Sequence, residues 1–148
     1  NNAEVAFPAP NALGASLLMR ADLFTLHNVK IKPVYVDTHS SVYLNVAIGA
    51  TDAGGGVQRT LSNQRALVQE KLRVIYETRL VNPHPIASHP RVSDEVSKAV
   101  QEAFFAISAS ESGGVLLGKV PMRQATASSL ADYSMLKQWG LDRFYVSN

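Results

Sequence analysis

Two stretches of the sequence place hydrogen-bond donors where helices are expected to begin. Residues 11–16 (NALGAS) open one apolar, periodic stretch, and residues 38–41 (THSS) open another. The first turn of a helix offers unpaired backbone N–H groups and a partial positive charge, which together suit an oxyanion. Thr38, His39 and Ser40 add side-chain donors. Plain N-capping accounts for the same residue types, so the pattern leaves an anion site and simple capping as alternatives.

Three consecutive glycines, Gly54–Gly56, follow Asp52-Ala53 and precede a helical-looking stretch. Glycine loses much conformational entropy on folding, but it permits unusual φ angles and a close approach of the backbone to another group. The run therefore predicts either a backbone that must pass close to something or a flexible strand-to-helix turn.

The sequence gives little support for a nucleotide-binding loop, a metal site or an enzyme active site. Residues 113–120 (GGVLLGKV) nearly match a phosphate-binding loop, but Val120 replaces the hydroxyl that binds Mg²⁺ and no strand precedes the motif. His84 and His89 lie five residues apart in an extended segment, which is poor spacing for one metal ion. No G-x-S-x-G elbow is present. We therefore expect a protein that is not an enzyme, with no catalytic residue, no metal site and no cofactor.

The bulk composition narrows the class further. The 148 residues carry a net charge of +2 with scattered Lys and Arg, which argues against a nucleic-acid partner. Without cysteine, neither a disulfide framework nor a thiolate metal site is possible. No stretch approaches the about 20 apolar residues of a membrane span. Because the chain begins NNAEVAF without Met, we expect a processed or excised piece that has lost any targeting segment.

The first 79 residues alternate between strand and helix patterns. We expect strands over 4–10, 31–38 and 73–79, a short strand or strand-to-loop turn over 51–57, and helices over 11–28, 39–49 and 58–72. Asn11 is the expected N-cap of the first helix and Gly49 the expected C-terminal glycine of the second. Repeated βα units predict an α/β fold: a mainly parallel sheet with helices on both faces. Ligands of such sheets sit beyond the carboxyl ends of the strands.

The alternation of strand and helix patterns ends after residue 82. Three prolines between 83 and 90 predict an extended crossover, residues 109–114 a loop, and residues 93–108 and 128–140 helices. Val96, Val100, Phe104 and Ile107 form an apolar stripe that needs a cover. We thus divide the chain into a βα unit over 1–82, a crossover segment over 83–91, and C-terminal helices over 92–148.

The segments AFPAPNALGASLL, THSSVYLNVAIGATDAGGGV, LRVIYET, HPIASHPRV and DYSMLKQWGLDRFYV follow one another in a set order. In that order the chain resembles the phosphate/phosphonate-type periplasmic solute-binding proteins of ABC transporters. Such proteins have two lobes that close on ligand like a hinge. The resemblance implies that this chain is the second lobe, the crossover and C-terminal helices that return to a first lobe whose N-terminal part is absent. It also implies a periplasmic or lipid-anchored extracytoplasmic location and an ABC permease as partner.

The resemblance also suggests site residues. His39 and Asp52-Ala53 match a family pattern at the cleft, and Gly54–Gly56 fall at its edge. The implied ligand contacts are Asn11, Ala12, Leu13, Gly14, Ser16, Thr38, His39, Ser40, Arg59 and His84.

Two departures from the family pattern bear on the ligand. Residues 12–15 (ALGA) replace the hydroxyl-rich S-T-S-G run of phosphonate-binding members. Arg59 and His84 occupy positions where aminophosphonate-binding members carry acids. A cationic tail would be repelled there, which favours a small anion such as phosphate, phosphite or phosphonate and leaves a ligand outside the phosphorus group as an alternative. The ligand-binding sensory domain of a membrane receptor, acting on an output domain, is the alternative function.

Overall fold

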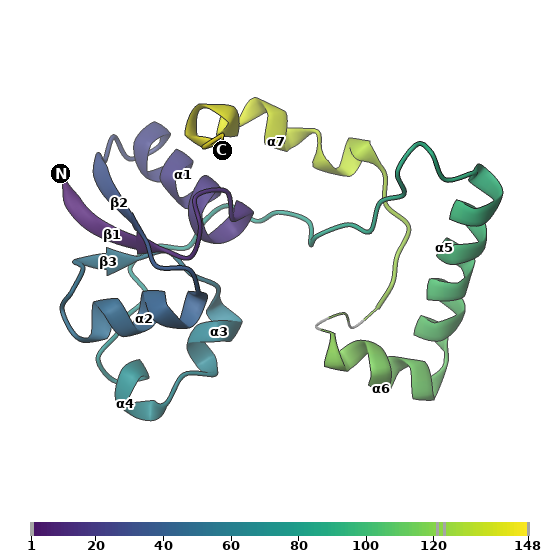
Figure 1. Cartoon of the computed structure of the whole chain (residues 1–148), viewed down its shortest axis with the longest axis horizontal. Helices are drawn as coiled ribbons and strands as arrows, with labels where there is room; N and C mark the ends of the chain where they lie inside the picture. Colours follow the sequence, from purple (N-terminus) through teal and green to yellow (C-terminus); the bar gives the residue numbers. More distant parts are fainter. Residues whose placement is uncertain (1, 121, 123, 148) are drawn as a thin grey trace. The chain divides into compact units, whose positions relative to one another are not determined.

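The computed structural model describes residues 2–120, 122 and 124–147 (Figure 1). The chain forms two compact units, one of residues 1–81 with 134–148 and the other of residues 82–133.

The first unit is built on a small parallel sheet. Strand β1 (Ala3–Phe7) lies between β2 (Ile31–Tyr35) and β3 (Ala53–Gly54), and both neighbours run parallel to it (Figure 1). Successive side chains of a strand point to opposite faces, yet Val5, Ala6 and Phe7 are all buried. Both faces of the central strand are therefore covered, as expected for a parallel sheet. The predicted α/β class with a mainly parallel sheet is confirmed.

Helices follow each strand of this sheet. A π-helical turn, η1 (Leu13–Leu18), continues into α1 (Met19–Thr25), and α2 (His39–Ala47) follows β2. Short helices α3 (Gln58–Ser62) and α4 (Ala66–Gln69) follow β3. The core joins the central strand to the first two helical segments through fully buried Phe7, Leu18 and Val42. Gly49 has a φ of 77°, which confirms the predicted glycine after α2.

The predicted helix over 58–72 is wrong as a single element. Arg65 has an extended conformation (φ −60°, ψ 145°) and separates α3 from α4. The Gln69 side-chain amide donates to the carbonyl oxygens of Ser62 and Gln64 at 3.1 and 2.7 Å. Because this amide satisfies carbonyls that a continuing helix would use, the chain can turn at residues 63–65.

The predicted strand over 73–79 is also wrong. Residues 73–81 run without helix or strand, and no backbone hydrogen bond joins them to a strand in the described part of the chain. The physical reason is a competing anchor: Tyr76 and Arg79 both bond the carboxylate of Asp22 on α1. That anchor holds the segment against the helix and leaves the free edge of β3 unpaired.

The second unit consists of helices. Ser93 caps α5 (Asp94–Ala109) by accepting from the backbone N–H of Val96 at 3.4 Å. The predicted loop over 109–114 is wrong, because Ser110 caps a further helix, α6 (Glu111–Lys119). The residues that nearly match a phosphate-binding loop lie within or directly after α6. Among the described residues, no helix is long and apolar enough to cross a lipid bilayer.

The predicted last helix over 128–140 is divided into short turns. A 3₁₀ turn, η2 (Leu130–Tyr133), belongs to the second unit, whereas α7 (Met135–Gln138) and η3 (Leu141–Phe144) belong to the first. The Asp132 carboxylate accepts from the backbone N–H of Ser129 at 2.7 Å, a bond that closes the 3₁₀ turn and lowers the pKa of Asp132. Gly140 has a φ of 64°, in the left-handed region that glycine adopts readily. The return of residues 92–148 to a first lobe stays a prediction.

Candidate functional site at the carboxyl edge of the sheet

Three helical segments begin at one edge of the sheet. Because β1, β2 and β3 are parallel, the starts of η1, α2 and α3 all follow the carboxyl ends of strands. This edge is where open α/β sheets bind ligands. It carries most of the residues that the sequence predicted for a ligand site.

At the start of α2, the helix has a side-chain N-cap, but one nitrogen of the neighbouring histidine has no hydrogen-bond partner in the part of the chain that the structure describes. Thr38 is the N-cap, and its Oγ1 accepts from the backbone N–H of Ser41 at 3.0 Å. The Ser40 hydroxyl oxygen accepts from the Gln64 side chain at 3.1 Å. In contrast, the Nδ1 of His39 is buried and has no hydrogen-bond partner among the described residues. Capping therefore accounts for Thr38 but not for His39.

The start of η1 offers backbone donors. Ala12 precedes it with an extended conformation and no side-chain cap. Its carbonyl accepts from Ser16 and Leu17, while the N–H groups of residues 13–15 have no acceptor within the described chain. The predicted N-cap role of Asn11 is wrong, because its side chain forms two hydrogen bonds with the backbone of Val146, at 2.7 and 2.9 Å. This start can therefore present only main-chain N–H groups.

Ser16, the one hydroxyl predicted for this start, is engaged inside the protein. Ser16 is fully buried, and its Oγ donates to the carbonyl of Pro10 at 3.1 Å. The Arg20 guanidinium donates to the same carbonyl. These bonds fix the loop that leads from β1 into η1 and direct the serine hydroxyl to the protein's own backbone.

The three glycines pack against the core of the first unit. A Cβ atom on Gly54 would lie 2.5 Å from Cγ1 of Val42, and one on Gly55 would lie 2.5 Å from Cε1 of Phe7. A Cβ atom on Gly56 would lie 2.6 Å from Cζ of Tyr43. Real Cβ atoms essentially never approach other heavy atoms this closely. Close packing of the chain against its own side chains, rather than flexibility, therefore requires glycine here.

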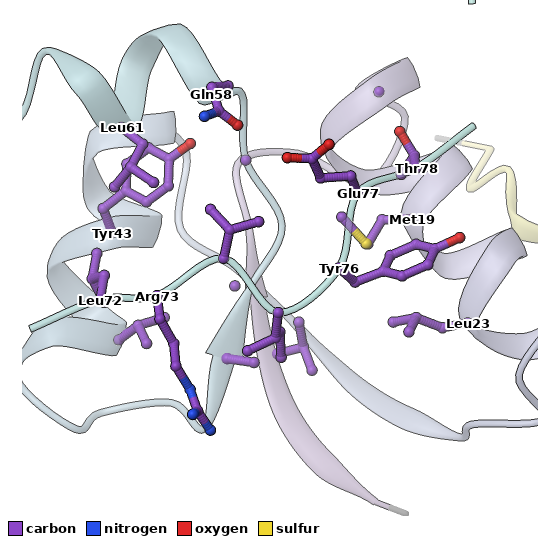
Figure 2. A pocket seen from close by; sticks show the side chains of 18 of the residues that line it. Met19, Leu23, Tyr43, Gln58, Leu61, Leu72, Arg73, Tyr76, Glu77 and Thr78 are labelled. Carbon is purple, nitrogen blue, oxygen red and sulfur yellow. The ribbon is translucent and has the colours of Figure 1, made fainter. Parts of the chain in front are cut away.

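A cavity of about 580 Å³ follows the unpaired edge of β3. The segment 72–80 forms its opposite wall. Figure 2 shows Gln58, Glu77 and Thr78 toward one end and Arg73 toward the other. Gln58 begins α3, so the first end opens at the carboxyl edge of the sheet. Of the residues predicted as ligand contacts, only Gly14 lines this cavity.

Tyr43 fixes the turn beside the cavity. Its hydroxyl donates to the carbonyl of Val57 at 2.7 Å. Burial raises the pKa of Tyr43, so its hydroxyl stays protonated and keeps this bond at neutral pH. The bond holds the residues between β3 and α3 in place.

Sequence reasoning missed Gln58, Glu77 and Thr78. The signal that could have revealed the last two is their place at the end of the apolar, alternating run RVIY, where a strand would reach the sheet edge. Arg59, which was predicted, lies in the first turn of α3, is exposed, and has no ion pair in the described part of the chain. His84 is exposed in the second unit.

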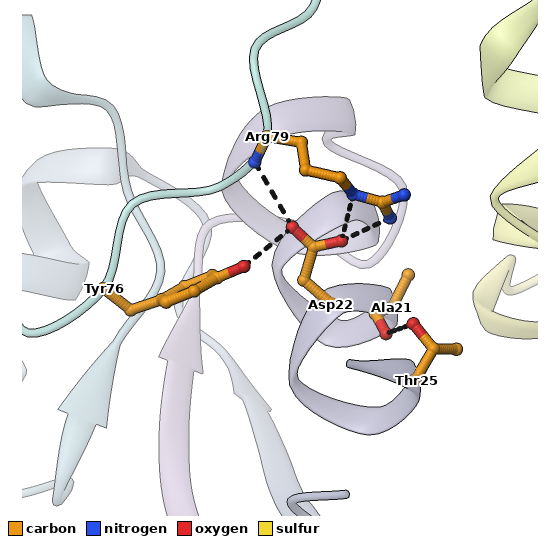
Figure 3. A network of polar contacts seen from close by, with 5 residues as sticks. All are labelled: Ala21, Asp22, Thr25, Tyr76 and Arg79. Atoms are coloured by element: carbon orange, nitrogen blue, oxygen red, sulfur yellow. Dashed lines mark hydrogen bonds and ion pairs between the residues drawn. The ribbon is translucent and has the colours of Figure 1, made fainter. Parts of the chain in front are cut away.

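A buried ionic cluster holds the wall of the cavity (Figure 3). The fully buried Asp22 accepts from Arg79 Nε at 2.9 Å and from the Tyr76 hydroxyl at 3.1 Å. The Arg79 guanidinium also stacks 3.9 Å above the ring of Trp139. Partial burial, and then the bond and charge of Asp22, raise the pKa of Tyr76. The cluster flanks Glu77 and Thr78 and thereby fixes their backbone.

Comparison with models of known protein families gives a match. A family model described as "ABC transporter, phosphonate, periplasmic substrate-binding protein" matches residues 1–133. No curated protein matches the sequence. Among the described residues, no group of three or more His, Cys, Asp or Glu side chains is placed to hold a metal ion.

Proposed function

The chain belongs to the family of periplasmic substrate-binding proteins of phosphonate ABC transporters, and on that premise we propose that it binds a small oxyanion by closure of two lobes. The family implies an extracytoplasmic location and a permease that receives the ligand. Phosphate, phosphite and simple phosphonates are the proposed ligands. Tighter binding to the closed arrangement would shift the protein toward closure, and the permease would recognise that state.

The unpaired Nδ1 of His39 is the observation that carries this proposal. A buried polar atom without a partner costs about 1–3 kcal/mol, which a ligand oxygen would recover. In the tautomer that carries its proton on Nδ1, His39 donates to an anion. Its position in the first turn of α2 adds the favourable end of the helix dipole.

Two further groups support an anionic ligand without an amine. The free N–H groups at the start of η1 are donors that suit oxyanion oxygens. The exposed guanidinium of Arg59 adds positive charge at the same edge of the sheet.

Replacement of His39 tests the proposed contact. We expect His39→Ala to weaken phosphate or phosphite binding about five-fold or more, because one hydrogen bond contributes about 1 kcal/mol. Isothermal titration calorimetry on the full-length protein would measure the change, and circular dichroism would verify the fold.

His27→Ala is the matched control. His27 is exposed just after α1, at the opposite edge of the sheet, where its ring contacts Tyr76. This variant should keep the wild-type affinity. Equal affinities of wild type and His39→Ala would assign His39 to local structure alone and remove the main support for the site.

A further inference from the structure

A second, shallower cavity of about 270 Å³ lies between α2 and α4, and we call it the α2–α4 groove. Leu44 and Ile48 border it from α2, and Leu67 borders it from α4. These side chains are 49%, 67% and 73% exposed. Single exposed apolar residues are ordinary, and here three of them line one hollow.

Two cations border the same groove. Arg65 and Lys71 line it, and no acidic side chain does. Neither cation forms an ion pair in the described part of the chain. An apolar hollow bounded by positive charges is complementary to an apolar side chain flanked by carboxylates. The rest of the lining is apolar, so a small oxyanion would find donors only on these two side chains.

The groove is separate from the proposed anion site. His39 begins α2 at the carboxyl edge of the sheet, whereas Leu44 and Ile48 lie five and nine residues further along. At 1.5 Å per residue, these positions are about 8 and 14 Å along the helix axis from His39. Lys71 lines both cavities, so Arg65 and Leu67 are the better residues for a test.

We propose that the α2–α4 groove docks an acidic, apolar-tipped segment of the transporter's permease. The inference rests on the proposed function, since only the substrate-binding component of a transporter needs such a partner. The apolar side chain would fill the hollow between Leu44, Ile48 and Leu67. Carboxylates beside it would face Arg65 and Lys71, which would speed association and fix the orientation of the complex.

Stimulation of the permease tests this surface. Full-length protein would be titrated against its permease in proteoliposomes, with ATP hydrolysis as the readout at saturating phosphite. We expect Arg65→Glu and Leu67→Gln each to raise the half-saturating protein concentration about ten-fold, as truncation of a central interface residue does. Added salt should weaken wild-type docking and leave Arg65→Glu less affected.

Matched controls use exposed residues of the same types outside the groove. Lys137→Glu on α7 and Leu26→Gln after α1 should leave the half-saturating concentration unchanged. Ile48→Gln serves as a second groove variant if Leu67→Gln does not fold. Anion affinity, measured by calorimetry, should stay within about two-fold of wild type in every variant, because none of these residues belongs to the proposed site.

The outcomes separate the two proposals. If groove variants that bind the anion normally stimulate the permease as well as the wild type does, the proposed docking surface is wrong and the proposed function is unaffected. Failure of the wild-type protein to bind any small oxyanion would instead overturn the proposed function. A groove covered by another part of the full-length protein would also overturn the inference, and it would appear as protection of Leu67→Cys from a soluble thiol reagent.

Discussion

At the scale of single residues, Gly54–Gly56 let the chain after β3 pass against three side chains of its own core. Gly55 is the tightest of them, because an added Cβ would meet both the Phe7 ring and the carbonyl oxygen of Ala15. A backbone carbonyl cannot swing aside as the end of a flexible side chain can. This position therefore links the turn before α3 to the packing of β1 and η1.

We expect Gly55→Ala to destabilise the protein by about 1–3 kcal/mol, the usual cost of overpacking a core. Urea unfolding followed by circular dichroism would measure the free energy of unfolding. Gly14→Ala is the control, because no atom lies within 4 Å of its added Cβ and its φ is not positive. A loss of stability as large in Gly14→Ala as in Gly55→Ala would refute the packing explanation.

The residues of the candidate site were only partly predictable. Thr38 as a cap follows from residue type and position, and the structure confirms it. The Nδ1 of His39 is buried and unpaired because of how neighbouring elements enclose it. The spacing of residues in the sequence does not reveal this enclosure. The engagement of Asn11 with Val146, 135 residues away, is equally invisible to local patterns.

At the scale of elements, the Asp22–Arg79–Trp139 cluster joins three parts of the first unit. Asp22 lies on α1, Arg79 on the segment that forms the cavity wall, and Trp139 directly after α7. The same cluster explains why the predicted strand over 73–79 does not form. Strands β1 and β2 and helices α2 and α5 were predictable because each carries its own apolar period. A strand at 73–79 would have needed a pairing partner, and the ionic anchor prevailed instead.

Removal of the Arg79 guanidinium should loosen this cluster. Breaking a buried ion pair by loss of one partner costs about 3–5 kcal/mol, and the lower end suits Arg79, whose side chain is 29% exposed. We expect Arg79→Met to lower the free energy of unfolding and to shift Trp139 fluorescence to longer wavelength as the ring loses its cover. Trp139 is the single tryptophan of these 148 residues, which makes the signal specific in this chain.

A double variant provides the control for that experiment. Asp22→Asn combined with Arg79→Met removes both charges and should recover part of the lost stability, because no uncompensated carboxylate stays buried. Arg91→Met, an exposed arginine of the second unit, should change neither quantity. No recovery in the double variant would show that packing, not charge pairing, accounts for the role of Arg79.

At the scale of the whole molecule, the family match over residues 1–133 covers the whole second unit and residues 1–81 of the first. The α5 stripe remains exposed within the second unit, where Val96, Val100 and Ile107 are 51%, 48% and 42% exposed. A return of residues 92–148 to a first lobe, which stays a prediction, would cover this stripe. The same two-lobed arrangement is what the proposed closure on a small anion requires.

The ligand preference of the full-length protein tests the central claim most directly. Wild type and Arg59→Glu would be titrated calorimetrically with phosphate, phosphite, methylphosphonate and aminoethylphosphonate, with Lys137→Glu as the charge-matched control. Hydrogen bonds to charged groups contribute about 1.5–3 kcal/mol, so Arg59→Glu should lower affinity for the three amine-free anions about ten- to a hundred-fold and improve aminoethylphosphonate binding. The account predicts that the wild-type protein binds at least one amine-free anion more tightly than aminoethylphosphonate. A wild-type protein that binds none of the four, or that binds aminoethylphosphonate most tightly, would contradict it.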